Sequence, residues 1–173
     1  LQGQRDIPLN DTGRAQAKRN GETLIATIPD IAGYDFVCSP LERSRETMEI
    51  ARLAMKLDPS AYRLDDRLRE ITFGDWEGFT LEELRVENDA LVEARERDKW
   101  GFMPPGGESY HLLSERVSGW LAEVRRPTVA VAHGGVGRVL LHAFLGTDRQ
   151  EIVSFPFPQD RFLVLRDSKV EWV

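Results

Sequence analysis

The sequence predicts an α/β fold, a three-layer sandwich in which helices flank a mostly parallel sheet. Two short apolar segments, residues 34–38 and 128–132, are each followed at once by a helical pattern. A strand that leads directly into a helix is typical of a βα unit, and alternating strands and helices favour a parallel sheet covered on both faces. The length of 173 residues suits a single domain over residues 1–173.

The first βα unit lies in the N-terminal third of the chain. A helix is expected from residue 12 to about residue 27, because Asn10 or Asp11 can cap its first turn. Residues 34–38 form the expected strand, and residues 41–56 the helix after it. Apolar side chains recur at helical spacing in this second helix, at Leu41, Met48, Ala51 and Met55.

The middle of the chain has less regular patterns. Residues 62–64 predict a short strand. Residues 67–79 mix charged and aromatic side chains without a period, which is typical of a functional loop. Thr80 and Glu83 form a capping box, which predicts the start of a charged surface helix that continues to about Arg97.

The C-terminal part contains a second βα unit. A long helix is expected over residues 109–125, with one apolar face made of Leu112, Leu113, Val117, Trp120, Leu121 and Val124. The unbroken apolar run at 128–132 predicts a strand that is covered on both faces. An apolar helix at 136–145, closed by Gly146, follows it. Residues 161–166 and 169–173 predict two strands of a hairpin with Asp167 and Ser168 at its turn.

Composition argues against several classes of partner. The net charge is −6 and the pI about 5.2, so a long phosphate backbone would be repelled and nucleic acid is not an expected partner. No stretch approaches the roughly 20 apolar residues that cross a membrane. The single cysteine, Cys38, excludes an internal disulfide and fits a cytoplasmic location. The three histidines do not have the spacing of metal ligands.

Candidate functional residues follow the two main strands. Ligands of parallel α/β sheets bind at the carboxyl ends of strands. His133 ends one strand and precedes two glycines and a helix, which favours a ligand contact over a merely structural histidine. Arg43 lies in the first turn after the other strand, where it can grip a phosphoryl group or simply be solvated. Composition leaves open whether Glu70, Asp75 or Glu77 is an acid in the loop at 67–79.

Taken together, the motifs resemble those of the histidine phosphatase superfamily, which has the phosphoglycerate mutase-like fold. They follow one another in the family's order along nearly the whole chain. They are residues 1–10 with Gly13, the arginine motif at 39–47, the acid loop at 68–78, residues 106–109, and Val-Ala-His-Gly-Gly at 131–135.

The resemblance assigns roles that spacing alone leaves open. It implies that Glu70 is the proton donor, that Arg43 rather than Arg45 binds phosphate, and that His133 is the family's second histidine. It also implies that Gln2 and Gly3 border the substrate pocket and that the Gly134 amide faces phosphate. The implied substrate is a small phosphorylated molecule, and the implied chemistry needs no metal or other cofactor.

One family motif is absent from the sequence. The family's nucleophilic histidine lies in an Arg-His-Gly motif at the end of a first strand, which would precede Leu1. We therefore expect that the natural N-terminal strand is missing from this chain and that neighbouring strands lack a partner. A molecule that starts at Leu1 is expected not to turn over.

The leading functional hypothesis is a phosphomonoesterase that acts through a phosphohistidine. A cofactor-dependent phosphoglycerate mutase is the alternative, although the segment between Gly78 and Gly106 is shorter than the insertion that the resemblance implies for mutases. A second alternative, which applies if the upstream histidine is truly absent, is a protein that binds a phosphorylated ligand without catalysis.

Overall fold

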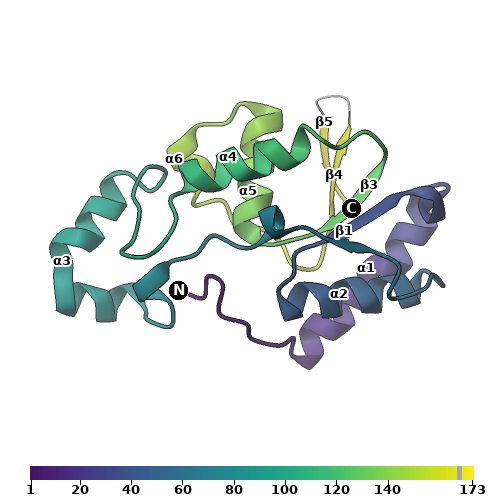
Figure 1. Ribbon diagram of the computed structural model, residues 1–173, viewed down its shortest axis with the longest axis horizontal. Helices are drawn as coiled ribbons and strands as arrows, with labels where there is room; N and C mark the ends of the chain where they lie inside the picture. The colour runs from purple at the N-terminus through teal and green to yellow at the C-terminus, as the bar shows by residue number, and fades with distance from the viewer. Residues whose placement is uncertain (167–168) are drawn as a thin grey trace.

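A computed structural model describes residues 1–166 and 169–173 (Figure 1). Its main elements are α1 (Asp11–Thr27), β1 (Asp35–Cys38), α2 (Glu42–Ala54), β2 (Arg63–Leu64), α3 (Leu81–Arg97), α4 (Tyr110–Leu121), β3 (Thr128–Val131), α5 (Gly134–Leu145), α6 (Arg149–Ile152), β4 (Leu163–Arg166) and β5 (Lys169–Trp172). Single 3₁₀ turns lie at 31–33, 66–68 and 74–76. None of the helices in this described part is long and apolar enough to cross a lipid bilayer.

The main sheet is parallel, as predicted. Its strand order is β2-β1-β3, and β1 pairs in parallel with both neighbours. Strands β4 and β5 form a separate antiparallel pair, in which Arg166 lies opposite Lys169. This pairing confirms the two strands of the predicted hairpin, while its turn at 167–168 lies outside the described residues.

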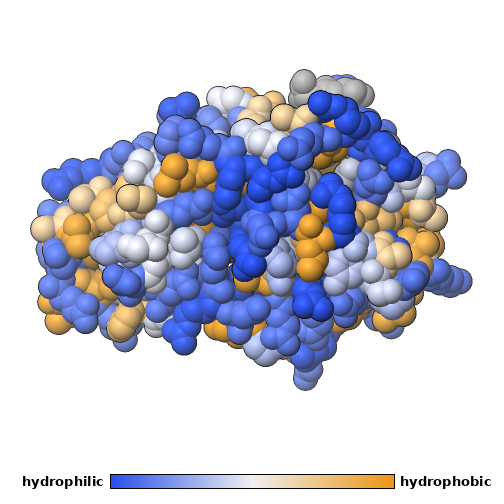
Figure 2. Space-filling model, viewed as in Figure 1, coloured by the Kyte–Doolittle hydropathy of each residue, from blue (hydrophilic) through white to orange (hydrophobic). Residues whose placement is uncertain are grey.

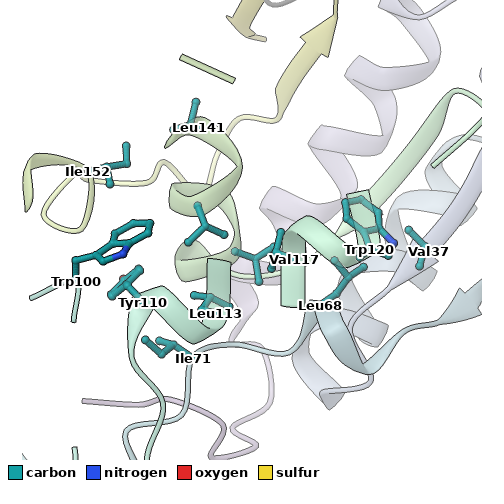
Figure 3. Close-up of a cluster of buried hydrophobic side chains, with 12 residues drawn as sticks. Val37, Leu68, Ile71, Trp100, Tyr110, Leu113, Val117, Trp120, Leu141 and Ile152 are labelled. Atoms are coloured by element: carbon teal, nitrogen blue, oxygen red, sulfur yellow. The ribbon is translucent and has the colours of Figure 1, made fainter. Parts of the chain in front are cut away.

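Helices cover both faces of the parallel sheet, which gives the predicted three layers. Alternate side chains of β1 point to opposite faces. Phe36 and Cys38 pack in a cluster with α1 and α2, whereas Val37 packs in a cluster with α4 and α5. Figure 3 shows the second cluster, in which Trp120 of α4 lies beside Val37.

Helix ends follow the signals in the sequence. The Asn10 side chain accepts a hydrogen bond from the Gly13 amide at the start of α1. Thr80 and Glu83 make both bonds of the predicted capping box. Gly146 ends α5 in the left-handed conformation at φ 62°, which glycine adopts without a steric penalty. Helix α3 has the predicted bounds but contains a kink at Asn88, whose φ is −156°.

Two burial predictions are wrong. The run at 128–132 is not covered on both faces, because β3 is only partly buried and Ala130 is exposed. Among the described residues β3 pairs with β1 alone, so it lies at the edge of the sheet. Leu112 is 41% exposed, because the buried stripe of α4 follows Leu113, Val117 and Trp120.

The outer surface carries mixed side chains. Figure 2 shows a largely hydrophilic face on which apolar side chains form small, separate patches.

Candidate active site

A cavity of about 380 Å³ brings together all six residues singled out from the sequence. Its lining contains Gln2, Gly3, Arg43, Glu70, His133 and Gly134. Leu9, Ser44, Thr47, Phe73, Ala132 and Gln159 complete the lining. These residues come from the N-terminal segment, the start of α2, the loop before α3, the β3–α5 junction and the segment before β4.

The topology explains this convergence. Strands β1 and β3 are parallel neighbours, so their carboxyl ends lie at the same edge of the sheet. Helix α2 starts at Glu42, shortly after β1, which places Arg43 in its first turn. His133 is the N-cap residue of α5, directly after β3.

The N-terminal segment anchors the Arg43 guanidinium. Nη2 of Arg43 donates to the Gly3 carbonyl at 2.9 Å, and Nη1 donates to the Arg5 carbonyl at 2.8 Å. The segment is itself fastened to the loop before α3, because Oε1 of Glu77 accepts from the Gln4 amide at 2.9 Å. Arg43 therefore has a fixed orientation and further N–H groups that face the cavity.

Glu77 is a structural carboxylate in this arrangement. Its Oε1 also accepts bonds from the Thr72 hydroxyl at 2.9 Å and from the Phe73 amide at 3.1 Å. Gly3 has φ +56°, and a side chain there would collide with the Glu77 carboxylate. Neither Glu77 nor Asp75 lines the cavity, which leaves Glu70 as the carboxyl group that does.

His133 is held by two buried serines. Its Nε2 lies 2.8 Å from the Ser39 hydroxyl and 3.2 Å from the Ser44 hydroxyl. Both serines are almost inaccessible, so the imidazole has little freedom to rotate. Burial, together with the smaller effects of the positive charges of Arg43 and Arg116, lowers the pKa of His133 to about 3. The ring is therefore neutral near pH 7, with one ring nitrogen as a hydrogen-bond donor and the other as an acceptor.

Glu70 is poised as an acid. Burial raises the pKa of its carboxyl group, and this effect outweighs the opposing bonds from the amides of Ile71 and Gly135 and the charges of Arg138 and Arg43. Oε1 accepts from Ile71 at 2.9 Å and from Gly135 at 3.1 Å. Oε2 has only the longer Gly135 contact of 3.3 Å, so it is the oxygen better able to carry a proton.

The start of α5 supplies backbone polarity to the cavity. Gly134 lines it at the positive end of the helix, where amide groups attract anions. A side chain at Gly135 would collide with the Glu70 carboxylate. Glycine at this position therefore allows α5 and the acid loop to meet.

Sequence reasoning missed several supporting residues. Ser39 and Ser44 lie five residues apart in the arginine motif. The sequence does not mark them as partners of His133, because the three side chains meet only in the folded structure. Arg116 was part of an expected helix and carried no signal. In the fold it donates to the carbonyls of Arg67 and Arg69 and pairs with Glu108 at 2.7 and 2.8 Å.

Gln159 was also missed, because it belongs to a segment without any pattern. It reaches the cavity from residues 153–162, which connect α6 to β4. Only the tertiary structure shows that this segment brings a side chain to the cavity.

The other two histidines lie elsewhere. Nδ1 of His142 is 2.7 Å from the Thr147 carbonyl, and its ring packs edge-on against Trp100. His111 is exposed, and its Nε2 lies 3.5 Å from Glu115. Within residues 1–166 and 169–173, no cluster of three or more His, Cys, Asp or Glu side chains is arranged to hold a metal ion.

The arrangement suits a phosphate ester. A guanidinium and a helix N-terminus provide positive charge for phosphoryl oxygens, and a neutral imidazole provides a hydrogen-bond donor. A carboxyl group with a raised pKa can give a proton to a leaving alcohol.

Comparison with known proteins agrees with this chemistry. The model of the histidine phosphatase superfamily, branch 1, matches residues 1–172. The chain belongs to the histidine phosphatase superfamily. Its fold, with a parallel sheet flanked by helices, is that of the solved phosphatases of this superfamily.

The relatives of this superfamily member include several phosphatases. Glucosyl-3-phosphoglycerate phosphatase of Mycolicibacterium vanbaalenii is 34% identical over 159 residues, which cover 84% of this chain and 67% of the relative. Adenosylcobalamin/alpha-ribazole phosphatase of Escherichia coli is 28% identical over 163 residues, which cover 91% of this chain and 76% of the relative.

Solved structures show the same likeness. A mycobacterial glucosyl-3-phosphoglycerate phosphatase in complex with inorganic phosphate superposes with a TM-score of 0.74 at 29% identity, over 90% of this chain and 78% of that one. The alpha-ribazole phosphatase of Shigella flexneri reaches a TM-score of 0.80 at 24% identity, over 100% and 86% of the two chains, and supports the fold alone.

Proposed function

We propose that the natural protein hydrolyses a small phosphorylated metabolite through a phosphohistidine intermediate. The observation that carries the proposal is the convergence of Arg43, Glu70 and His133 on one cavity of about 380 Å³. The relatives named as phosphatases support hydrolysis of a phosphomonoester.

The proposed reaction has two steps. A histidine nitrogen attacks phosphorus in line, and the bond between phosphorus and the alcohol oxygen breaks while Glu70 gives its proton to that oxygen. Water then attacks the phosphohistidine, gives a proton to the Glu70 carboxylate, and releases inorganic phosphate and the free histidine. The nucleophile in this proposal is the histidine of the family's Arg-His-Gly motif, which the sequence resemblance assigns to a position before Leu1.

The described residues stabilise the transferred group. Arg43 and the Gly134 amide offer positive charge to the equatorial oxygens, where negative charge accumulates in the transition state. His133 is neutral because of its lowered pKa, so its ring N–H can donate to a phosphoryl oxygen without adding charge. Gln2 and Gly3 line the same cavity, which supports the proposal that they border the bound substrate.

Phosphate binding tests the pocket without requiring turnover. Isothermal titration of the 173-residue chain with inorganic phosphate should give saturable binding at one site. Arg43→Ala and His133→Ala should each weaken it by about tenfold or more, because a charge-assisted hydrogen bond typically contributes about 1.5–3 kcal/mol. Unchanged affinity in both variants would show that the anion binds elsewhere.

The acid role of Glu70 is tested by the leaving group. In the natural protein, Glu70→Gln should slow the hydrolysis of an alkyl phosphate far more than that of p-nitrophenyl phosphate, whose leaving group needs little protonation. Arg43→Ala and His133→Ala should each lose most turnover on both substrates. An equal loss on the two substrates in Glu70→Gln would remove Glu70 from the role of proton donor.

A phosphoglycerate mutase is the competing enzyme. Single-turnover assays with 3-phosphoglycerate and 2,3-bisphosphoglycerate separate the two activities, since a phosphatase releases phosphate faster than it isomerises. Faster isomerisation would favour the mutase. N-terminal sequencing of the natural protein in the same preparation tests the non-catalytic alternative, which requires that no Arg-His-Gly motif be present.

A further inference from the structure

Two buried hydroxyl groups meet the imidazole of His133 at one of its nitrogens. We propose that Ser39 and Ser44 are positioning residues of the active site, which donate their hydroxyl protons to Nε2 of His133 and so keep the ring's own proton on Nδ1, where a phosphoryl oxygen can accept it. The phosphoryl contact rests on the proposed function, whereas the choice of ring nitrogen follows from hydrogen bonds within the chain.

The register of the sheet places Ser39 beside His133. Cys38 of β1 lies opposite Val131 of β3, and the Ser39 amide continues the ladder by donating to the Val131 carbonyl at 2.9 Å. His133 follows two residues after Val131. Pro40 comes directly after Ser39 and favours an extended backbone there. The contact of 2.8 Å between the Ser39 hydroxyl and Nε2 is therefore built into the ends of two paired strands.

The Ser39 hydroxyl is enclosed by residues of this chain. Ser39 is 0% exposed, so no further group can reach its oxygen without a rearrangement of the fold. The oxygen accepts a hydrogen bond from the Leu41 amide at 3.4 Å. Among the described residues, Nε2 of His133 is the acceptor that lies within hydrogen-bond distance of its proton. Because buried polar groups in proteins are hydrogen-bonded, the Ser39 proton goes to Nε2.

The opposite tautomer would leave this proton without a partner. With a proton on Nε2, the Ser39 oxygen would accept from both the ring and the Leu41 amide, and its own proton would be buried without an acceptor. An unsatisfied buried donor costs more free energy than a satisfied hydrogen bond gains. Ser44 is 3% exposed and brings a second hydroxyl to 3.2 Å from the same nitrogen, so it favours the same tautomer.

The tautomer matters because the ring is neutral. The pKa of His133 is lowered to about 3, so near pH 7 one ring nitrogen carries a proton and the other a lone pair. The ring lines the cavity, and in the described part of the chain its hydrogen bonds are those of Nε2 with the two serines. A proton on Nδ1 can be donated to an anion, whereas a lone pair there would repel a phosphoryl oxygen.

Heteronuclear NMR of the imidazole rings measures the tautomer directly. In the 173-residue chain at neutral pH, a protonated ring nitrogen and a bare one resonate far apart, and the signals of His133 are those lost in His133→Gln. We expect the proton of His133 on Nδ1. His142 is an internal reference, because its Nδ1 lies 2.7 Å from the Thr147 carbonyl, which only accepts. A proton on Nε2 of His133 would refute the proposal.

Substitution of the serines tests their part in this choice. Ser39→Ala combined with Ser44→Ala removes both donors, so the two nitrogen signals of His133 should move toward each other as the second tautomer becomes populated. Ser39→Ala alone should have a larger effect than Ser44→Ala alone, because its contact is shorter. Ser109→Ala is the matched control, since it removes the hydroxyl of a serine that is 4% exposed and caps α4. An unchanged tautomer in the double variant would refute the role of the serines.

Phosphate affinity tests whether Ser39 acts through the ring. In the natural protein, Ser39→Ala should weaken the binding of inorganic phosphate about three- to tenfold in isothermal titration, the effect of one weakened hydrogen bond. The same substitution added to His133→Ala should cause no further loss, because Ser39 does not line the cavity. A further loss of the same size would show that Ser39 supports the fold in general rather than the imidazole.

The outcomes separate this inference from the proposed function. The tautomer is read without a ligand, so NMR alone can refute it while the phosphatase proposal stands. If the natural protein does not bind inorganic phosphate, the proposed function fails, and the phosphoryl contact of Nδ1 fails with it. If phosphate binds but Ser39→Ala leaves its affinity unchanged, the positioning role is refuted and the phosphate pocket stands.

Discussion

Arg116 joins the acid loop to α4, and its removal should destabilise the whole protein. Its Nη1 donates to the carbonyls of Arg67 and Arg69 at 2.6 and 2.9 Å, and its Nη2 reaches the Glu70 carbonyl at 3.2 Å. The same guanidinium makes a two-pronged pair with Glu108. Arg116→Met therefore leaves the Glu108 carboxylate and the carbonyls of Arg67 and Arg69 without this donor, while the Glu70 carbonyl keeps its bond from the Gln4 side-chain amide at 2.8 Å.

The size of the effect follows from burial. The Arg116 and Glu108 side chains are 21% and 15% exposed, so water replaces only part of the lost bonds. Removing one partner of a buried ion pair typically costs about 3–5 kcal/mol, and partial exposure favours the lower end, about 3 kcal/mol. For a chain of this size, that change corresponds to a fall in Tm of about 6–12 °C.

Urea denaturation of both single variants and the double variant measures this contribution. Glu108→Gln should cost much less than Arg116→Met, about 1 kcal/mol, because the bonds to the loop carbonyls remain. Arg116→Met combined with Glu108→Leu should be more stable than Arg116→Met alone, since no carboxylate is left unpaired. A loss below about 1 kcal/mol in Arg116→Met would refute the view that this arginine holds the loop.

Two further predictions concern pH and packing. The pKa of His133 falls from an ordinary 6.5 in the unfolded chain to about 3 in the fold, so the unfolded state gains a proton that the folded state refuses as pH drops from about 6.5 toward 3. The free energy of unfolding should therefore decrease as pH falls through this window, by up to about 1.4 kcal/mol per pH unit. Urea denaturation at several pH values should show a weaker dependence of this free energy on pH in His133→Gln. The same pH dependence in both proteins would contradict the neutral imidazole. Gly21→Ala should destabilise by about 1–3 kcal/mol, because the new methyl group meets the backbone of Ala51 where α1 packs on α2. The matched change Gly119→Ala in α4 points into open space and should stabilise by about 1 kcal/mol from helix propensity, so thermal shifts of the same sign in both variants would count against this packing argument.

Local chemistry determined much of the fold from the sequence. Cap residues such as Asn10 and Thr80 accept hydrogen bonds from amides three residues further along the chain. The starts of α1 and α3 can therefore be predicted from neighbouring residues alone. Apolar spacing likewise identified the buried face of α2, because helical geometry alone places Met48 and Ala51 on one side. The order of the motifs pointed to the superfamily in the same way, since each motif is a short continuous segment.

Long-range packing decided what the sequence left open. The exposure of Ala130 depends on which strands stand beside β3, and no property of residues 128–132 encodes that. The clamp of Ser39 and Ser44 on His133 joins residues some 90 positions apart, and Gln159 enters the cavity from a segment with no pattern. Such contacts form only when the chain folds, because the packing that buries these side chains involves residues far apart in the sequence. Only the tertiary structure therefore shows which side chains meet around the anion.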